Sequence, residues 1–267
     1  MSYKPHISRY HIFLISLFSI VWIWAAINPL YRDGWLLENL LIFLFVPIIF
    51  LIGKYFKLSN VSYTLITVFI IMHVVGSHYT YAEMPFGYVL QDWTGADRNM
   101  YDRLVHYSFG FLLAYPIREI FMRVSKTKGL WSYYFPFELV LAFSGLYEVV
   151  EWIAAARVDP AAGLAFLGTQ GDIWDAQKDM ILASAGALFA MLFIAAINFL
   201  YDKNFAKEIM ESIAIERGDN PIGEMRLREL FAVEKKTFAR HLFIFIVLAC
   251  AIWIIGYFIL NSLIEVL

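Results

Sequence analysis

The sequence predicts an all-α, polytopic transmembrane helix bundle. Of its 267 residues, 61% are hydrophobic and 18% are aromatic, while only 16% are charged. Soluble domains carry about 25% charged residues, so this composition is typical of a membrane protein. The apolar residues form runs of about 20, the length that a helix needs to cross the hydrocarbon core with its backbone hydrogen bonds satisfied. These observations favour one bundle of membrane helices over separate soluble domains.

Seven apolar runs are candidates for transmembrane helices. They lie near residues 11–30, 36–53, 61–79, 103–122, 134–154, 177–200 and 241–263. The first run follows a basic start and resembles a signal peptide, but it is long and aromatic and similar runs follow it. We therefore expect it to remain as the first span. The chain divides into a six-span core at residues 1–200, a connecting segment at 201–240 and a seventh helix at 241–267.

The distribution of lysine and arginine predicts the orientation of the bundle, because cytoplasmic segments carry the excess of these residues. With the N-terminus inside, sixteen of the 21 basic residues fall on inside segments and five fall on outside segments. The sequence therefore predicts an inside N-terminus and an outside C-terminus. The net charge of −2 gives no reason to expect nucleic-acid binding.

The segment 202–240 is the one long charged region between the predicted spans. Its apolar residues recur at helical spacing on both sides of the turn signal "GDNPIG", which predicts two amphipathic helices. Eight acidic residues balance eight basic residues, so strong attraction to anionic lipid is not implied. We expect a solvated connecting segment that packs on the cytoplasmic end of the bundle.

Polar side chains from four predicted spans reach the same outer layer of the bundle. These residues are all histidines or acids, and they are His73, His78, Asp102, His106, Glu148, Glu151, Asp172, Asp175 and Asp179. Asp102 and His106 are four residues apart, Glu148 and Glu151 are three apart, and Asp172, Asp175 and Asp179 are three and then four apart. These separations place side chains on one face of a helix. Ionisable groups in a membrane segment usually face the bundle interior or a water-filled cavity. The spacing therefore predicts a shared polar site.

Several neighbouring carboxylates need protons, basic partners or a cation to coexist. The basic residues expected nearby are Arg103, Arg157 and Lys178, which are too few for these acids. A divalent metal bound by the nine acidic and histidine residues would resolve the conflict. Carboxylates with imidazole, and no thiolate, favour zinc, manganese or iron.

Structural alternatives apply to several of these residues. Asp102, Asp172 and Asp175 lie where helices are expected to begin, so each could act as an N-cap or complement the helix dipole. A lone histidine such as His73 is more often a packed, hydrogen-bonded residue than a metal ligand. Asp179 lies too far inside its helix to cap it, which makes Asp179 the more informative acid.

The motifs "DRLVH", "GLYEVVEW" and "GDIWDAQKDMILASAG" resemble the YjdF family of bacterial inner-membrane proteins over roughly residues 10–200. The same core is similar to the VanZ-like family, which is associated with glycopeptide resistance. That family has an Asp-Lys-x-x-His helix start, a Glu-x-x-Gln/Glu helix end and an Asp-x-x-x-Asn helix start. The matching residues here are Asp102 with His106, Glu148 with Glu151, and Asp175 with Asp179, and Arg103 replaces the lysine. The resemblance implies a multi-pass envelope protein, and the extra acids Glu151 and Asp179 suggest stronger cation binding.

Three kinds of function remain open. The first is a metal-dependent envelope enzyme that acts on a lipid-linked or cell-wall precursor, with catalytic roles for His106, Glu151 and Asp175 and substrate contacts from Arg103, Arg157 and Lys178. The second is an ion- or proton-coupled transporter that uses the acids as cation sites. The third is a non-catalytic membrane scaffold in which the cluster has a structural role. Membrane lipid is the expected environment in each case.

Overall fold

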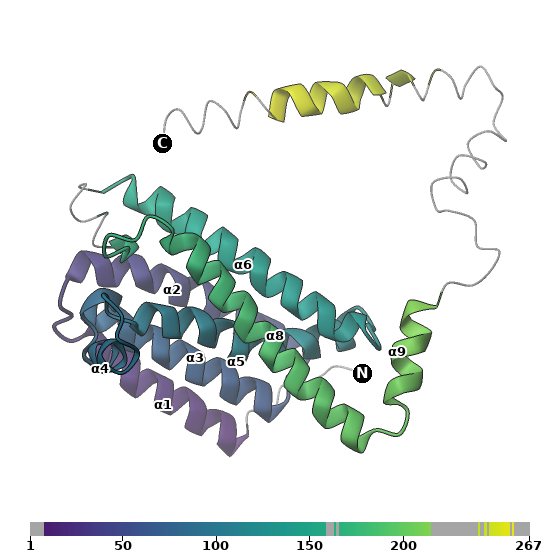
Figure 1. The fold of residues 1–267 in the computed structure, drawn as a ribbon, viewed down its shortest axis with the longest axis horizontal. Coiled ribbons are helices and arrows are strands. Elements are labelled where there is room, and N and C mark those ends of the chain that lie inside the picture. Colours follow the sequence, from purple (N-terminus) through teal and green to yellow (C-terminus); the bar gives the residue numbers. More distant parts are fainter. Residues whose placement is uncertain are drawn as a thin grey trace. The chain divides into compact units, whose positions relative to one another are not determined.

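The computed structural model describes residues 8–158, 163, 166–214, 240, 243, 244, 246–256 and 258. Every regular element within these residues is helical (Figure 1), in agreement with the predicted fold class. The chain divides into two compact units, Met1–Ile213 and Ala214–Leu267. The first unit holds the predicted six-span core and the polar site.

The first unit combines long helices with three shorter ones among its described residues. In chain order they are α1 Arg9–Ala26, α2 Arg32–Tyr55, α3 Asn60–Tyr79, the 3-10 helix η1 Tyr81–Glu83, α4 Pro85–Thr94, α5 Tyr101–Val124, α6 Trp131–Ala155, α8 Asp175–Tyr201 and α9 Phe205–Ile213. Each of the first six predicted spans is a helix. The second is longer than the apolar run alone indicated, since α2 has 24 residues. α5 continues through Pro116.

Within the described residues, four helices are long and apolar enough to cross a membrane, namely α1, the Arg32–Gly53 part of α2, α3 and α8. α5 and α6 have 24 and 25 residues but are not among these four helices. The total of seven spans and the orientation therefore remain predictions. In the second unit, Ile246–Gly256 forms an apolar helix, and the other residues of the predicted span 241–263 lie largely outside the described part of the chain.

Helix α5 is the centre of the first unit and packs on α3, α6 and α8. Its closest approach is to α8, where glycines allow the two backbones to touch. A Cβ atom on Gly110 would lie 1.8 Å from the Ala183 carbonyl oxygen, and one on Gly186 would lie 2.1 Å from the Tyr107 carbonyl oxygen. Small residues at helix crossings are typical of membrane bundles. Because of this contact, the first turns of α5 and α8 lie beside each other.

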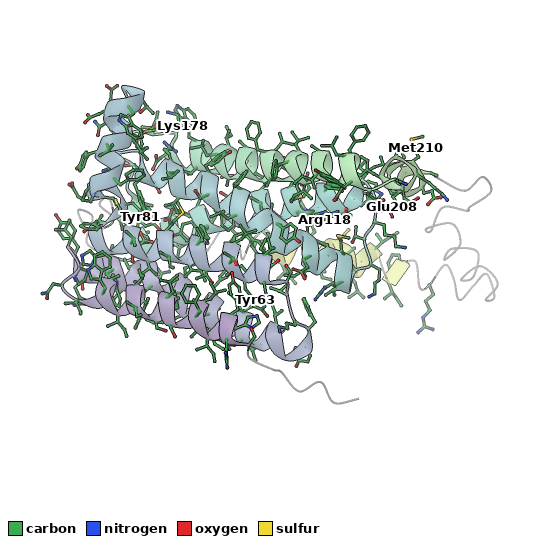
Figure 2. All side chains as sticks on the ribbon, turned by 90° about the horizontal axis from the view of Figure 1, so that it is seen from below. Tyr63, Tyr81, Arg118, Lys178, Glu208 and Met210 are labelled. Atoms are coloured by element: carbon green, nitrogen blue, oxygen red, sulfur yellow. The ribbon has the colours of Figure 1, made fainter. Side chains whose placement is uncertain are left out.

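The two ends of the first unit differ in their side chains (Figure 2). Tyr81 and Lys178 lie at one end, and Arg118, Glu208 and Met210 lie at the other. The starts of α5 and α8 and the end of α6 belong to the first of these ends. This end is where the predicted polar residues gather, and we call it the acidic end.

The opposite end is closed by α9, which is amphipathic as predicted for the first part of the connecting segment. Ser212 on α9 accepts a hydrogen bond from the Leu130 backbone N–H (2.9 Å), and its carbonyl accepts one from Trp131 Nε1 (2.7 Å). Gly129 has a positive φ of 53°, and a Cβ there would lie 2.3 Å from the Glu208 carbonyl. These contacts attach α9 to the start of α6. The second predicted amphipathic helix lies outside the described residues.

Candidate functional site

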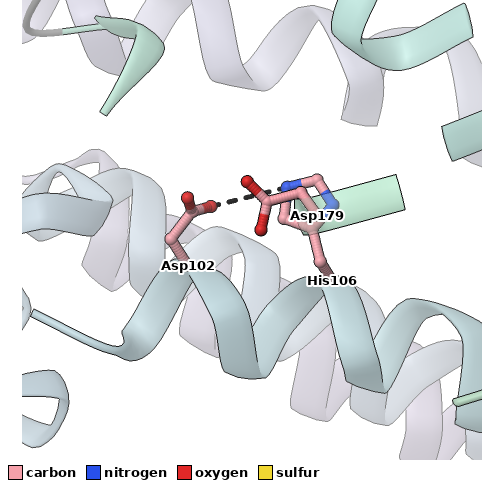
Figure 3. Close-up of side chains that lie close together, drawn as sticks. All are labelled: Asp102, His106 and Asp179. Atoms are coloured by element: carbon pink, nitrogen blue, oxygen red, sulfur yellow. Dashed lines mark ion pairs between the residues drawn. The ribbon is translucent and has the colours of Figure 1, made fainter. Parts of the chain in front are cut away.

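Asp102, His106 and Asp179 form a compact acid–imidazole group at the acidic end (Figure 3). One ligand atom from each residue lies within 4.8 Å of the others. His106 Nε2 is 3.5 Å from Asp102 Oδ1 and 3.8 Å from Glu148 Oε1. Asp102 and His106 are four residues apart on α5, while Asp179 comes from α8 and Glu148 from α6. Three helices therefore place three carboxylates around one imidazole, and we call these four residues the cation cluster.

N-capping does not account for the aspartates at the starts of α5 and α8. The N-cap positions of α5 and α8 are Met100 and Trp174, and neither makes a side-chain cap hydrogen bond. Asp172 accepts a bond from the Trp174 backbone N–H (3.1 Å), so the capping alternative applies in part to Asp172. Asp102 and Asp175 lie inside the first turns, where a carboxylate suits the helix dipole, but their side chains pair with Arg98, Arg103 and His106.

Arg103 binds the acidic start of α8. Its guanidinium lies 3.1 Å from Asp172 Oδ2, 2.6 Å from Asp175 Oδ1 and 2.7 Å from Asp179 Oδ1. It also donates to the Asp175 backbone carbonyl (3.0 Å), and its side chain is only 8% exposed. Such a group is a counter-ion within the protein. This placement differs from the predicted role of Arg103 as a substrate-binding residue.

Arg98 is a second buried counter-ion, and the sequence analysis did not include it in the site. It forms ion pairs with Asp175 and with Asp102, the latter at 3.5 Å, and it donates to the carbonyls of Gly168 (3.0 Å) and Thr169 (3.3 Å). The four-residue spacing from Arg98 to Asp102 was the available signal. With Arg98 included, basic side chains balance part of the acidic charge that a metal was expected to neutralise.

The neighbour of Arg98 explains how an arginine from a connecting segment reaches the cluster. Asn99 is buried, and its backbone N–H donates to Gln170 Oε1 (2.9 Å) while Gln170 Nε2 donates back to the Asn99 carbonyl (3.2 Å). Asn99 Nδ2 also donates to the Met84 carbonyl (2.9 Å). These bonds join the segment after α4 to the segment before α8, and they fix the backbone next to Arg98.

Two carboxylate oxygens of the cation cluster have no hydrogen-bond partner. They are Asp179 Oδ1 and Glu148 Oε1, and both atoms are buried. Asp179 Oδ1 is close to Arg103 Nη1, but the pair lacks the angular geometry of a hydrogen bond. Buried polar atoms in folded proteins are usually satisfied by protein or by an ordered water or ion. These two oxygens point to a cation or water between α5, α6 and α8.

His73 and His78 lie apart from the cation cluster. His73 Nε2 donates to the Glu38 carbonyl (3.0 Å), and Nδ1 lies 2.5 Å from the Tyr81 hydroxyl. Burial raises the pKa of the Tyr81 phenol, so this hydroxyl keeps its proton and donates to Nδ1. His78 Nδ1 contacts the Ala25 carbonyl (3.0 Å), and its ring stacks on Trp24 at 4.5 Å. Both predicted metal ligands therefore serve helix packing in this structure.

Glu151 lies next to a buried acid that the sequence analysis missed. Glu38 on α2 is 7% exposed, and Tyr147 donates to its Oε2 (3.3 Å). Tyr147 also contacts the Glu151 carboxyl, and its ring is 6.2 Å from that of His106. A single acid in the apolar run 36–53 was the signal for Glu38. Glu38, Tyr147 and Glu151 form a second polar layer beside the cation cluster.

An open pocket leads from the surface to the cation cluster. It has a volume of about 530 Å³ and is lined by Glu148 and Trp152 of α6 and by Asp172 and Asp175 at the start of α8, among others. Lys178 is half exposed and binds Asp172 Oδ2 at 2.6 Å. This hydrogen bond is the main reason why the pKa of Asp172 is below its ordinary value.

Arg157, the remaining predicted substrate contact, is exposed beyond the C-terminal end of α6. It forms no ion pair with any residue that the structure describes. Arg157 therefore does not share the ion pairs with the α8 aspartates that Arg103 and Lys178 make.

Comparison with known proteins gives a family for the chain. Residues 10–198 match a family described as predicted membrane protein (DUF2238). The chain is 37% identical over 178 residues to the inner membrane protein YjdF of Escherichia coli (strain K12), and the match covers 66% of this chain and 85% of that protein. No solved structure matches significantly. The predicted resemblance to the YjdF family is thus confirmed. The chain is an inner-membrane protein and belongs to the DUF2238 family of predicted membrane proteins.

Proposed function

We propose that the cation cluster binds one divalent cation. The observation that carries this proposal is the approach of ligand atoms of Asp102, His106 and Asp179 to within 4.8 Å of one another. Glu148 adds a fourth candidate ligand, and its Oε1 is one of the two buried oxygens without a hydrogen-bond partner. Three carboxylates and one imidazole suit zinc, manganese or iron(II). Arg98 and Arg103 together pair with Asp172 and Asp175, and each also contacts one aspartate of the cation cluster.

We further propose that the cation serves an enzyme reaction on a polar group that enters the open pocket. A cation at this position would supply Lewis-acid activation of water or of the substrate. Glu148 borders both His106 and the pocket, so we propose that it binds the cation through Oε1 and accepts a proton through its other oxygen. Asp175, a predicted catalytic residue, is held by two arginines and is less suited to that role. The proposed substrate is a lipid-linked or cell-wall precursor at the outer face.

We also propose that the motifs resembling the VanZ-like family mark this same site. The three motif pairs come from α5, α6 and α8 and meet at the acidic end. One of the two extra acids, Asp179, belongs to the cation cluster, while the other, Glu151, lies beside Tyr147. The two extra acids are therefore expected to have different effects on cation binding.

Metal analysis of the purified protein tests the proposal. After incubation with zinc or manganese and removal of free ion, the wild type should retain about one equivalent per chain by mass spectrometry. Asp179→Asn should lose it, because the amide replaces a charged ligand with a neutral one. Glu151→Gln is the matched control and should retain it.

Equal metal content in the wild type and in Asp179→Asn, or no metal in either, would contradict the cation site. Release of product from lipid extracts by the loaded wild type, and not by Glu148→Gln, is the expected result for the enzyme. Cation-dependent flux in liposomes without such release would favour the transporter instead.

A further inference from the structure

A second, apolar groove lies between α6 and α8. It has a volume of about 520 Å³, and its walls include Phe137 and Leu141 of α6 and Met180, Ser184 and Leu188 of α8. The Ser184 hydroxyl donates to the Met180 carbonyl (2.7 Å), so it leaves no unsatisfied donor in the groove. This helix pair thus offers an elongated apolar surface directly below the open pocket.

The groove and the open pocket use the same two helix faces. On α6, Leu141 of the groove is followed one and two turns later by Gly145 and by Glu148 of the pocket. On α8, Ala176 lines the pocket, and the groove begins at the next residue, Gln177. Helical residues three or four apart share a face. The two hollows are therefore successive parts of one surface.

Met180 lines the groove and lies one turn after Ala176, which lines the pocket. A Cβ atom on Gly145 would lie 3.1 Å from Met180 Cε, so the absence of a side chain at residue 145 makes room for the end of this thioether. A methionine side chain is unbranched and adapts its shape readily. This part of the groove is thus formed by a movable apolar side chain instead of by rigid backbone.

The groove lies on a helix that is long and apolar enough to span the membrane, in a chain of a membrane-protein family. The apolar molecules available at that depth are lipid chains. The open pocket at the end of the groove carries Glu148, Asp172 and Asp175 in its wall, with Lys178 at Asp172. An amphiphilic lipid has the same order of apolar and polar parts, because its apolar chain ends in a polar head.

We propose that the groove binds one hydrocarbon chain of a membrane lipid whose polar head occupies the open pocket. This inference rests on the proposed function, because it names a membrane lipid as the substrate class for the cation cluster. Hydrocarbon in the bilayer is as apolar as the groove, so moving the chain adds little hydrophobic free energy. The groove selects and aligns the chain, and the polar head supplies the affinity. Alignment of the head against the cluster is the catalytic benefit.

Photo-crosslinking tests the groove directly. The probe is phosphatidylethanolamine with a diazirine in the middle of one acyl chain, incorporated into detergent micelles with the full-length protein. Mass spectrometry of the crosslinked peptides should place the label on groove residues such as Leu141, Ser184 and Leu188. An excess of unlabelled phosphatidylethanolamine should abolish this label, since a single site is saturable.

Ser184→Trp should fill the groove and remove the label there, while its metal content stays at the wild-type level. Phe189→Trp is the matched control, because Phe189 is exposed on α8 and does not line the groove, and it should leave the label unchanged. Labelling of the wild type spread evenly over the outer surface of α8, or labelling that excess lipid does not reduce, would overturn the groove proposal. The labelling pattern is measured separately from metal content, so failure of the groove proposal can be distinguished from failure of the cation site. The labelling of the wild type tests the groove even if Ser184→Trp does not fold.

Discussion

Arg103 reaches from α5 to Asp172, Asp175 and Asp179 at the start of α8. The distances to these three carboxylates are between 2.6 and 3.1 Å, and the guanidinium is nearly buried. Removing one partner from a buried ion network leaves the other charges uncompensated, which costs more than the network itself contributes. Arg103 should therefore hold the helix start together, and its loss should affect folding before it affects ligand binding.

We expect Arg103→Met to lower the free energy of unfolding by about 3–5 kcal/mol, the cost typical of breaking a buried ion pair by removing one partner. Denaturation of the protein in mild detergent, followed by intrinsic fluorescence, measures this change. Arg157→Met is the control, because Arg157 is exposed and outside the network, and it should shift the midpoint little. Equal stability of the two variants would contradict the counter-ion role of Arg103.

The contact between α5 and α8 is the element on which the site depends. Gly110 and Gly186 let the two backbones touch. His106 lies one turn before Gly110 and Asp179 lies two turns before Gly186, so the same contact brings these two side chains together. Interiors are close-packed, so a change of one methyl group at such a contact is felt by its neighbours. The site is therefore coupled to helix packing.

Gly186→Ala should destabilise the protein by about 1–3 kcal/mol or more, as overpacking does, and it should also weaken cation binding. The new Cβ would lie 2.1 Å from a backbone carbonyl oxygen that cannot move alone. Gly34→Ala is the control, since a Cβ there meets only ordinary contacts near 4 Å. Thermal stability and metal content of both variants are the measurements. A Gly186→Ala protein with wild-type values of both would contradict the coupling.

Helices and their polar faces were predictable from the sequence, whereas the pairing of charges was not. Apolar run length located the first six predicted spans, and the i to i+4 spacing of Asp102 and His106 placed them on one face. The role of Arg98 depends on the bonds between Asn99 and Gln170, which lie 71 residues apart, so no local pattern reports it. Glu38 reaches the second polar layer, beside Tyr147 and Glu151, from α2. The position of His73 depends on packing against α2 and η1, and that of His78 depends on packing against α1. Such contacts join residues far apart in the sequence, so local sequence patterns do not predict them and only the tertiary structure shows them.

On the scale of the whole first unit, charge is divided between the two ends. The acidic end holds Arg98, Arg103 and Lys178, all paired with aspartates. Many basic residues at the opposite end are exposed. They include Lys126 and Lys128 before α6, and Lys203 and Lys207 near α9. Since basic segments stay in the cytoplasm, the acidic end and its open pocket are predicted to face outward.

Cysteine labelling in intact cells measures this orientation. In a Cys250→Ser background, Trp93→Cys on α4 should react with a membrane-impermeant maleimide, because residue 93 is 76% exposed at the acidic end. Glu211→Cys on α9 should react only after the membrane is permeabilised. The reverse pattern would place the cluster on the cytoplasmic side and would contradict an outer-face substrate.

The central claim is that His106, together with Asp102 and Asp179, holds a divalent cation. Electron spin-echo measurements on the manganese-loaded protein test it most directly, because they detect nitrogen bound to the metal. We predict coupling to one imidazole nitrogen in the wild type and in His73→Gln, and its loss in His106→Gln. Absence of nitrogen coupling from the manganese-loaded wild type, or its loss in His73→Gln while His106→Gln retains it, would contradict the site described for this protein.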